Sequence, residues 1–190
     1  MGAPLVIRAF RIPGRLAYGC TDLTTAWPHG GTGLGFTSRV EVVRDGPLEE
    51  IPDGAHGVLT KDLVYGGERV SLNGILRDWD ADALGQVFPN VATGGTTGFP
   101  LIQGGGTVRA GYLYSTRVTV VVFTPQSLID GNEDIHEMVV LYAALPHVEQ
   151  QARMMLDLQG ERAVPVSYVA TARAAGDTYE IGRRRDLTAI

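Results

Sequence analysis

The sequence is poor in the residues on which cross-linking and nucleic-acid binding depend. Its one cysteine, Cys20, cannot form a disulfide within the chain, so we expect a reducing compartment or an assembly that does not depend on disulfides. Lys61 is the only lysine, and the formal net charge is −5. Proteins that bind nucleic acid without regard to sequence use many cationic side chains to displace phosphate counterions. The charge therefore argues against that class.

Long apolar runs are also missing. Stretches such as Val118–Phe123 are far too short to span a bilayer. The N-terminal residues MGAPLVIRAF contain no charged region followed by a long apolar stretch, so they predict no signal peptide. We therefore expect a protein with no membrane partner.

Glycine, proline and arginine are the residues that stand out. The 190 residues include 25 glycines and 10 prolines, which indicates many turns within a chain long enough for one domain. Almost all the basic residues are arginine, which tolerates protein interfaces better than lysine. Codon usage in a GC-rich genome would explain the same bias, and both explanations stay open.

Two segments show the alternation of a half-buried strand. In the first, Phe36, Val40 and Val42 alternate with Thr37, Arg39 and Glu41. In the second, Glu68–Arg77, the apolar residues are Val70, Leu72 and Leu76. Gly66-Gly67 predicts a hairpin that joins Asp62–Tyr65 to this second strand.

Three further runs predict strands of the core. Val118–Phe123 and Met138–Leu145 are apolar on both faces, which is typical of covered strands, and Val164–Thr171 is expected to be the last core strand. Helices are predicted over Asp80–Phe88 and about Pro146–Leu158. The expected fold is mainly β (α+β): a β-sandwich or barrel with one or two flanking helices.

The rest of the chain is expected to form arms and loops. We predict an N-terminal arm or irregular segment over 1–33, a β-sandwich domain over 34–172 and a C-terminal arm over 173–190. Long loops are expected at Asp45–Gly57 and Pro89–Gly106. Loops of that length in a compact domain are usually functional or disordered. In a structural protein they would contact neighbouring subunits, and flexible loops are the alternative.

The motifs of common enzymes are missing from the sequence. Gly31–Gly35 is glycine-rich but precedes a strand, no lysine opens a helix after a glycine, and no serine lies in a Gly-x-Ser-x-Gly turn. The histidines are isolated: His29, His56, His136 and His147. Asp130–Asp134 begins like a calcium-binding loop, but Ile135 and Leu141 stand where glycine and glutamate are required. We therefore predict that the chain is not an enzyme and that it has no catalytic residues, no metal site and no cofactor.

Four other features have a structural and a functional interpretation. Trp27 and Trp79 could form a ligand platform, and packing is the simpler interpretation for Trp79 at the start of a helix. Cys20 fits a buried thiol better than a nucleophile, since no histidine lies near it in sequence. Arg183–Arg185, next to Asp186, could bind nucleic acid or pair with a neighbouring subunit.

Taken together, four segments resemble the bacteriophage tail tube protein family. They are Val70–Leu84 (VSLNGILRDWDADAL), Val118–Pro125 (VTVVVFTP), Val140–Pro146 (VLYAALP) and Val164–Thr171 (VPVSYVAT). The resemblance implies a structural virion protein, made in the host cytoplasm, whose hexameric rings stack into a tube for DNA passage. It also implies that a long loop, Asp45–Lys61 by position, reaches the adjacent ring. Expected partners are other copies of the chain and the terminator, baseplate and tape-measure proteins of the tail.

Two hypotheses compete with the tube subunit. One is another ring protein of the tail: a terminator, baseplate or tail completion protein. The other is a monomeric β-barrel ligand-binding module or enzyme. For the tube, six chains at −5 give 6 × (−5) = −30 per ring. This charge suggests an acidic lumen that repels DNA phosphates.

Overall fold

The fold is mainly β, in a computed structural model that describes residues 5–46, 48–52, 60–65, 69–78, 91–94, 101–104, 118–131, 136–147, 155–156, 162–171 and 178–190. The strands are β1 (Leu5–Phe10), β2 (Gly14–Tyr18), β3 (Thr32–Asp45), β4 (Leu48–Pro52), β5 (Thr60–Tyr65), β6 (Arg69–Asp78), β7 (Val91–Gly94), β8 (Leu101–Gly104), β9 (Thr119–Pro125), β10 (Met138–Pro146), β11 (Met155–Leu156), β12 (Arg162–Ala170) and β13 (Tyr179–Gly182). A short helix, α2 (Gln126–Ile129), and a 3₁₀ turn, η2 (Arg184–Asp186), complete the described elements.

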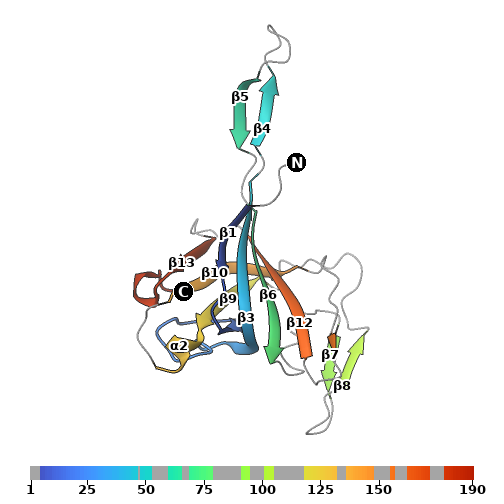
Figure 1. Ribbon diagram of the computed structural model, residues 1–190, viewed down its shortest axis with the longest axis vertical. Helices are drawn as coiled ribbons and strands as arrows, with labels where there is room; N and C mark the ends of the chain where they lie inside the picture. The colour runs from blue at the N-terminus through green and yellow to red at the C-terminus, as the bar shows by residue number, and fades with distance from the viewer. Residues whose placement is uncertain are drawn as a thin grey trace.

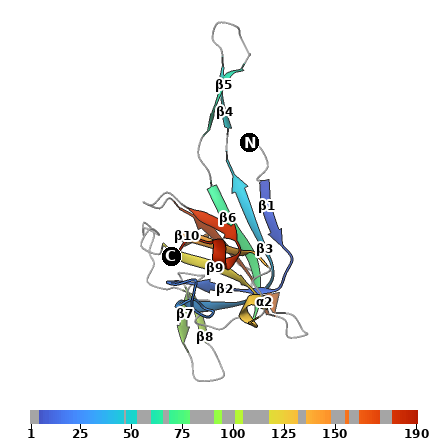
Figure 2. The same ribbon diagram turned by 90° about the vertical axis from the view of Figure 1, so that its left-hand side faces the viewer.

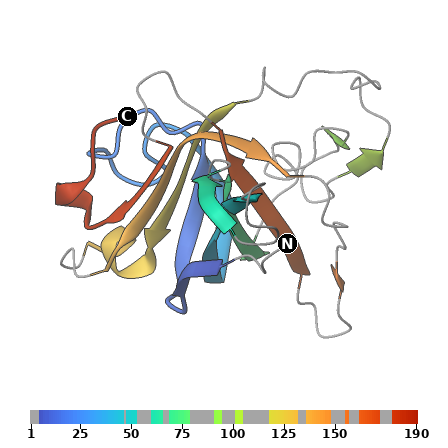
Figure 3. The ribbon, with the colours of Figure 1, turned by 90° about the horizontal axis from the view of Figure 1, so that it is seen from above.

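Six antiparallel strands form a closed barrel in the order β12–β6–β3–β2–β9–β10 (Figures 1 and 3). The ring closes where the end of β10 pairs with β12, with Pro146 opposite Tyr168 and Ala144 opposite Ala170. The first part of β10 pairs instead with β13, so this one strand contacts three others. The predicted β class and the barrel are confirmed.

The barrel interior holds the side chains that the alternating pattern predicts, except Phe36, which is only partly buried. Val40 and Val42 of β3, and Leu72 and Leu76 of β6, are fully buried among residues from all six strands. Thr37 departs from the pattern, because it was expected on the polar face and is also buried. The register of β3 against β6 shifts on both sides of Thr37, and its hydroxyl donates to the Arg39 carbonyl (2.8 Å). This irregularity turns Thr37 inward.

Strands β9 and β10 are buried on both faces, as predicted. Val121 and Leu141 point into the barrel, whereas Val122 and Val140 belong to a second apolar cluster. A period of two places neighbouring residues on opposite faces. The second cluster therefore lies on the outside of β9 and β10. Because other segments of the chain cover this outer face, neither face of the two strands needs to be polar.

A two-stranded ribbon, β4–β5, projects from one end of the barrel (Figures 1 and 2). It continues the β3–β6 pair, because Asp45 is opposite Arg69 and Leu48 is opposite Tyr65. The predicted hairpin between Asp62–Tyr65 and the β6 strand is therefore wrong, since β5 pairs with β4. The loop predicted over Asp45–Gly57 is also wrong in part, because Leu48–Pro52 within it forms the strand β4.

Two other predictions need correction. The predicted helix over about Pro146–Leu158 is wrong at both ends, because Pro146 ends β10 and Met155–Leu156 is the strand β11. The predicted loop Pro89–Gly106 contains the paired strands β7 and β8. The predicted helix Asp80–Phe88, with Trp79, lies outside the described residues.

Strands near both ends of the chain belong to the sheet. The expected irregular segment over 1–33 is wrong at β1 and β2, since β1 pairs with β3 and β2 is a barrel strand between β3 and β9. In the expected C-terminal arm, β13 pairs with β10. Val164–Thr171, expected as the last core strand, corresponds to β12, which is the last barrel strand in chain order, and β13 follows it outside the barrel.

Two buried tyrosines give a matched test of the packing. Within the described part of the chain, the Tyr168 hydroxyl is fully buried without a hydrogen-bond partner. The Tyr142 hydroxyl donates to Glu180 (2.9 Å). An unpaired buried hydroxyl destabilises the folded state, whereas a paired one stabilises it.

We expect Tyr168→Phe to raise the free energy of unfolding by about 1 kcal/mol and Tyr142→Phe to lower it by a similar amount. Urea denaturation of both variants beside the parent chain measures the two changes. A loss of stability in Tyr168→Phe would contradict this account of the core.

Candidate assembly surface

The outside of the barrel divides into a covered half and an open half. The covered half is formed by β2, β9 and β10, whose outward residues Ala17, Val122 and Val140 lie in the second apolar cluster. The segment 19–31, helix α2 and the C-terminal segment 183–190 lie over it (Figures 1 and 3). Among the described residues, no segment covers the other half, which is formed by β3, β6 and β12 and is called the open half.

A buried histidine fastens the segment 19–31 to the barrel. His29 is 1% exposed, and its Nδ1 donates to the Thr25 carbonyl (3.1 Å). Its Nε2 therefore accepts from the Thr124 hydroxyl of β9 (2.8 Å). Burial disfavours the imidazolium and lowers the pKa of His29 below its ordinary value.

Cys20 lies in the same buried layer. Its thiol is 3.6 Å from the Pro28 carbonyl, and burial raises its pKa to about 12. A thiol held protonated in this way is a poor nucleophile. The interpretation of Cys20 as a buried thiol is confirmed.

Trp27 is partly buried and packs against the second apolar cluster on the covered half. The Arg15 guanidinium lies 5.2 Å from the centroid of its ring. A Cβ atom on Gly33 would lie 2.3 Å from the indole, so glycine is needed for the ring to approach β3 this closely. Trp27 thus packs against the protein, as expected of a structural aromatic residue.

The C-terminal segment is held by one carboxylate. Glu180 accepts from the Thr188 amide (2.8 Å), from the Thr188 hydroxyl (2.6 Å) and from Tyr142. Partial burial opposes ionisation of Glu180, but these hydrogen bonds outweigh it, so its pKa is lowered. Leu187 and Ile190 then pack on the second apolar cluster.

The arginine run Arg183–Arg185 makes contacts within the chain through Arg184 and Arg185. Arg184 donates to the carbonyls of Thr24 and Thr25, the latter at 3.2 Å, and so links the C-terminal segment to the segment 19–31. Arg185 lies 3.9 Å from the Asp186 carboxylate. The exposed Arg183 lies between the end of β13 and the start of η2.

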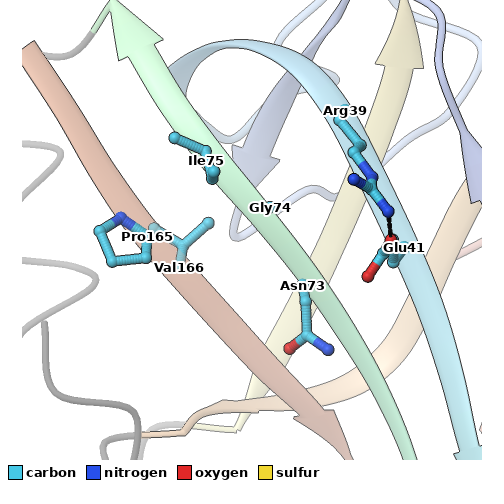
Figure 4. Close-up of a pocket in the computed structure, with 7 residues that line it drawn as sticks. All are labelled: Arg39, Glu41, Asn73, Gly74, Ile75, Pro165 and Val166. Atoms are coloured by element: carbon cyan, nitrogen blue, oxygen red, sulfur yellow. Dashed lines mark hydrogen bonds and ion pairs between the residues drawn. The ribbon is translucent and has the colours of Figure 1, made fainter.

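Two depressions lined by described residues lie on the open half. The larger has a volume of about 320 Å³ and spans β3, β6 and β12 (Figure 4). Ile75 of β6 lies opposite Pro165 of β12 in this depression, and Arg39 and Glu41 form an ion pair on β3. Its remaining lining residues are Asn73, Gly74 and Val166.

The smaller depression, about 220 Å³, lies nearer the ribbon. Arg69 donates to Nε2 of His147 (2.7 Å) at this end, and Asp45 is opposite Arg69 in the register. Ser167 donates to the side-chain carbonyl of Asn73 (2.6 Å), which lines both depressions.

Ile75 distinguishes this face from an ordinary polar sheet surface. It is 39% exposed, and Val118, at 40%, is the other large hydrophobic residue of the described chain with such exposure. The outward charges of β3 and β6 nearly balance, with Arg39, Arg69 and Arg77 against Glu41 and Asp45. This face can therefore bury an apolar contact between charged margins.

The other candidate residues are not brought together. His29, His136 and His147 belong to separate parts of the fold, and His56 lies outside the described residues, as do 132–134 of the Asp130–Asp134 segment. Asp130 accepts from the Gln126 side chain (2.7 Å). Across the described ranges, no three His, Cys, Asp or Glu side chains are grouped so as to hold a metal ion. The same ranges contain no helix long and apolar enough to cross a bilayer.

The larger depression on the open half was not predicted from the sequence. Its lining comes from three strands, and only their register places Ile75 beside Pro165. The one signal was that Ile75 interrupts the otherwise polar outward row of β6, which consists of Arg69, Ser71, Asn73 and Arg77.

The comparisons with known proteins leave the family open. No protein-family model matches the chain. A search of curated proteins finds no significant match either.

The buried His29 predicts a pH-dependent stability. Because its pKa in the folded chain is below the unfolded value of about 6.5, the unfolded chain binds more protons between these two values. The stability that the neutral imidazole provides is complete above pH about 6.5 and decreases as the pH falls toward the folded pKa.

Chemical denaturation between pH 8 and 5 should therefore show a falling free energy of unfolding, and His29→Gln should flatten this slope. His136→Gln, at a partly exposed position, is the control and should keep it. Equal slopes in the parent chain and His29→Gln would refute this role of His29.

Proposed function

We propose that this chain is a non-enzymatic structural subunit that assembles with copies of itself, as the tail tube subunit of a phage or phage-like particle. The observation that carries the proposal is the β4–β5 ribbon. It projects from the barrel, and among the described residues its strands pair only with each other (Figures 1 and 2).

A two-stranded ribbon alone in water is at best marginally stable. The sequence of β4 and β5 is nevertheless rich in apolar residues: Leu48, Ile51, Leu63, Val64 and Tyr65. A ribbon of this composition is stabilised if it packs against another surface. Its projection away from the barrel favours a surface on a second copy.

The barrel is suited to ordered assembly. Closure through β10 and β12 pairs the edges that these two strands would otherwise expose at this seam. Contact through one projecting element and one different surface repeats from copy to copy without closing, and cyclic symmetry within a ring limits lateral growth. Stacked hexameric rings with long inter-subunit loops are the arrangement that we propose.

The charge of the lumen is part of this proposal. The outward residues of β3 and β6 carry both signs, so an acidic lumen that repels DNA would have to come from another surface. The formal charge of −5 per chain is compatible with such a surface elsewhere. The DNA would then pass without binding.

Negative-stain electron microscopy of the purified chain over a concentration series tests the function. We expect stacked rings or hollow tubes. Rings that stop at one layer would favour a terminator or baseplate protein, and monomers of 20.3 kDa at every concentration would contradict self-assembly.

A ribbon-deleted variant is the matched control. Because Asp45 and Arg69 are register partners, residues 46–68 can be replaced by a two-residue Asn-Gly turn. This variant should fold, with an unchanged circular dichroism spectrum apart from the lost ribbon, and should not stack. Tubes formed by the variant would show that the ribbon is not required.

A further inference from the structure

The ribbon and the larger depression lie toward opposite ends of one strand pair. β3 and β6 continue into the ribbon beyond Asp45 and Arg69, whereas the larger depression lies near Ile75, six residues farther along β6. That separation corresponds to about 20 Å along a strand. From this arrangement we infer that the larger depression of one copy receives the β4–β5 ribbon of the next copy.

The dimensions of the two elements agree. β4 has five residues, which span about 16 Å and can lie along the strands that form the depression. Glu50, in the middle of β4, is ten residues from Val40, which is level with the depression. A copy displaced by about 33 Å along the strand direction, and by about 10 Å perpendicular to the sheet so that the two copies do not overlap, therefore brings its depression to the ribbon of its neighbour.

The chemistry of the two surfaces is complementary. The depression offers the apolar Ile75 and Pro165 to a ribbon whose strands are rich in apolar residues. The ribbon strands carry Glu49, Glu50 and Asp62 against Lys61, a net charge of −3 + 1 = −2.

Arg39, whose side chain is 56% exposed, lies at the margin of the depression and can meet an acidic side chain of the ribbon. Its present partner, Glu41, is only 27% exposed. The exposed Asp78 near the same end limits the electrostatic gain, so the apolar contact at Ile75 dominates.

This contact is head-to-tail, because the ribbon of each copy meets a different surface of the next. Such a contact leaves one free ribbon and one free depression at the two ends of every stack. The inference rests on the proposed function and adds to it the surface that receives the ribbon.

Ile75→Glu tests the depression directly, and Val118→Glu is its matched control. Both replace an exposed aliphatic residue, at 39% and 40% exposure, but only Ile75 lines the depression. Ile75→Glu should raise the concentration for half-maximal assembly by about tenfold or more, since a buried unpaired carboxylate disfavours the contact. Val118→Glu should assemble as the parent chain does.

A mixing experiment tests the direction of the contact. The ribbon-deleted variant keeps its depression, and Ile75→Glu keeps its ribbon. At concentrations too low for Ile75→Glu to stack, neither variant should stack alone. An equimolar mixture should nevertheless form a mixed complex in size-exclusion chromatography with multi-angle light scattering. Thermal denaturation of each variant shows that it is folded.

The outcomes separate the inference from the function. If the parent chain assembles, Ile75→Glu assembles equally well and the ribbon-deleted variant does not, the ribbon binds elsewhere and the inference is wrong while the function stands. Failure of the mixture to form a complex, with both variants folded, also overturns the inference. If the parent chain remains monomeric at every concentration, both the function and the inference are wrong.

Discussion

The pairing of the end of β10 with β12 is the interaction on which the other features depend. Pro146 and Tyr168 face each other at this seam, and their pairing converts a curved sheet into a closed barrel. Without closure, the edges of β10 and β12 would be open to other chains. With closure, the interior is filled from all sides, and the remaining contacts of the molecule must use its outer surface or its projecting ribbon.

The outer surface is then divided by what covers it. His29 holds the segment 19–31 against Thr124 of β9, and Glu180 holds the C-terminal segment through Thr188 and Tyr142. Arg184 links these two covers. The half formed by β3, β6 and β12 has no such cover among the described residues, and its depressions and the exposed Ile75 make it the surface available for assembly.

The sequence predicts strands well where burial imposes a simple period. β3, β6, β9, β10 and β12 all follow from alternation or from continuous apolar runs, because each has a defined relation to the barrel interior. β2 was missed because five residues, GRLAY, carry too short a pattern beside Pro13. The helix predicted from Pro146 failed because pairing with Tyr168 outweighs the helical pattern that follows. The ribbon and the depression depend on register between strands, which single-strand patterns do not contain.

The central claim is that the ribbon is completed by a second copy. Hydrogen–deuterium exchange of the amides of β4 and β5, compared between dilute and concentrated protein, measures this most directly. The account predicts fast exchange in the ribbon of the dilute chain and strong protection on concentration, while amides of β9 and β10 stay protected throughout. Equal exchange of the ribbon at both concentrations, in samples that electron microscopy shows to be assembled, would contradict it.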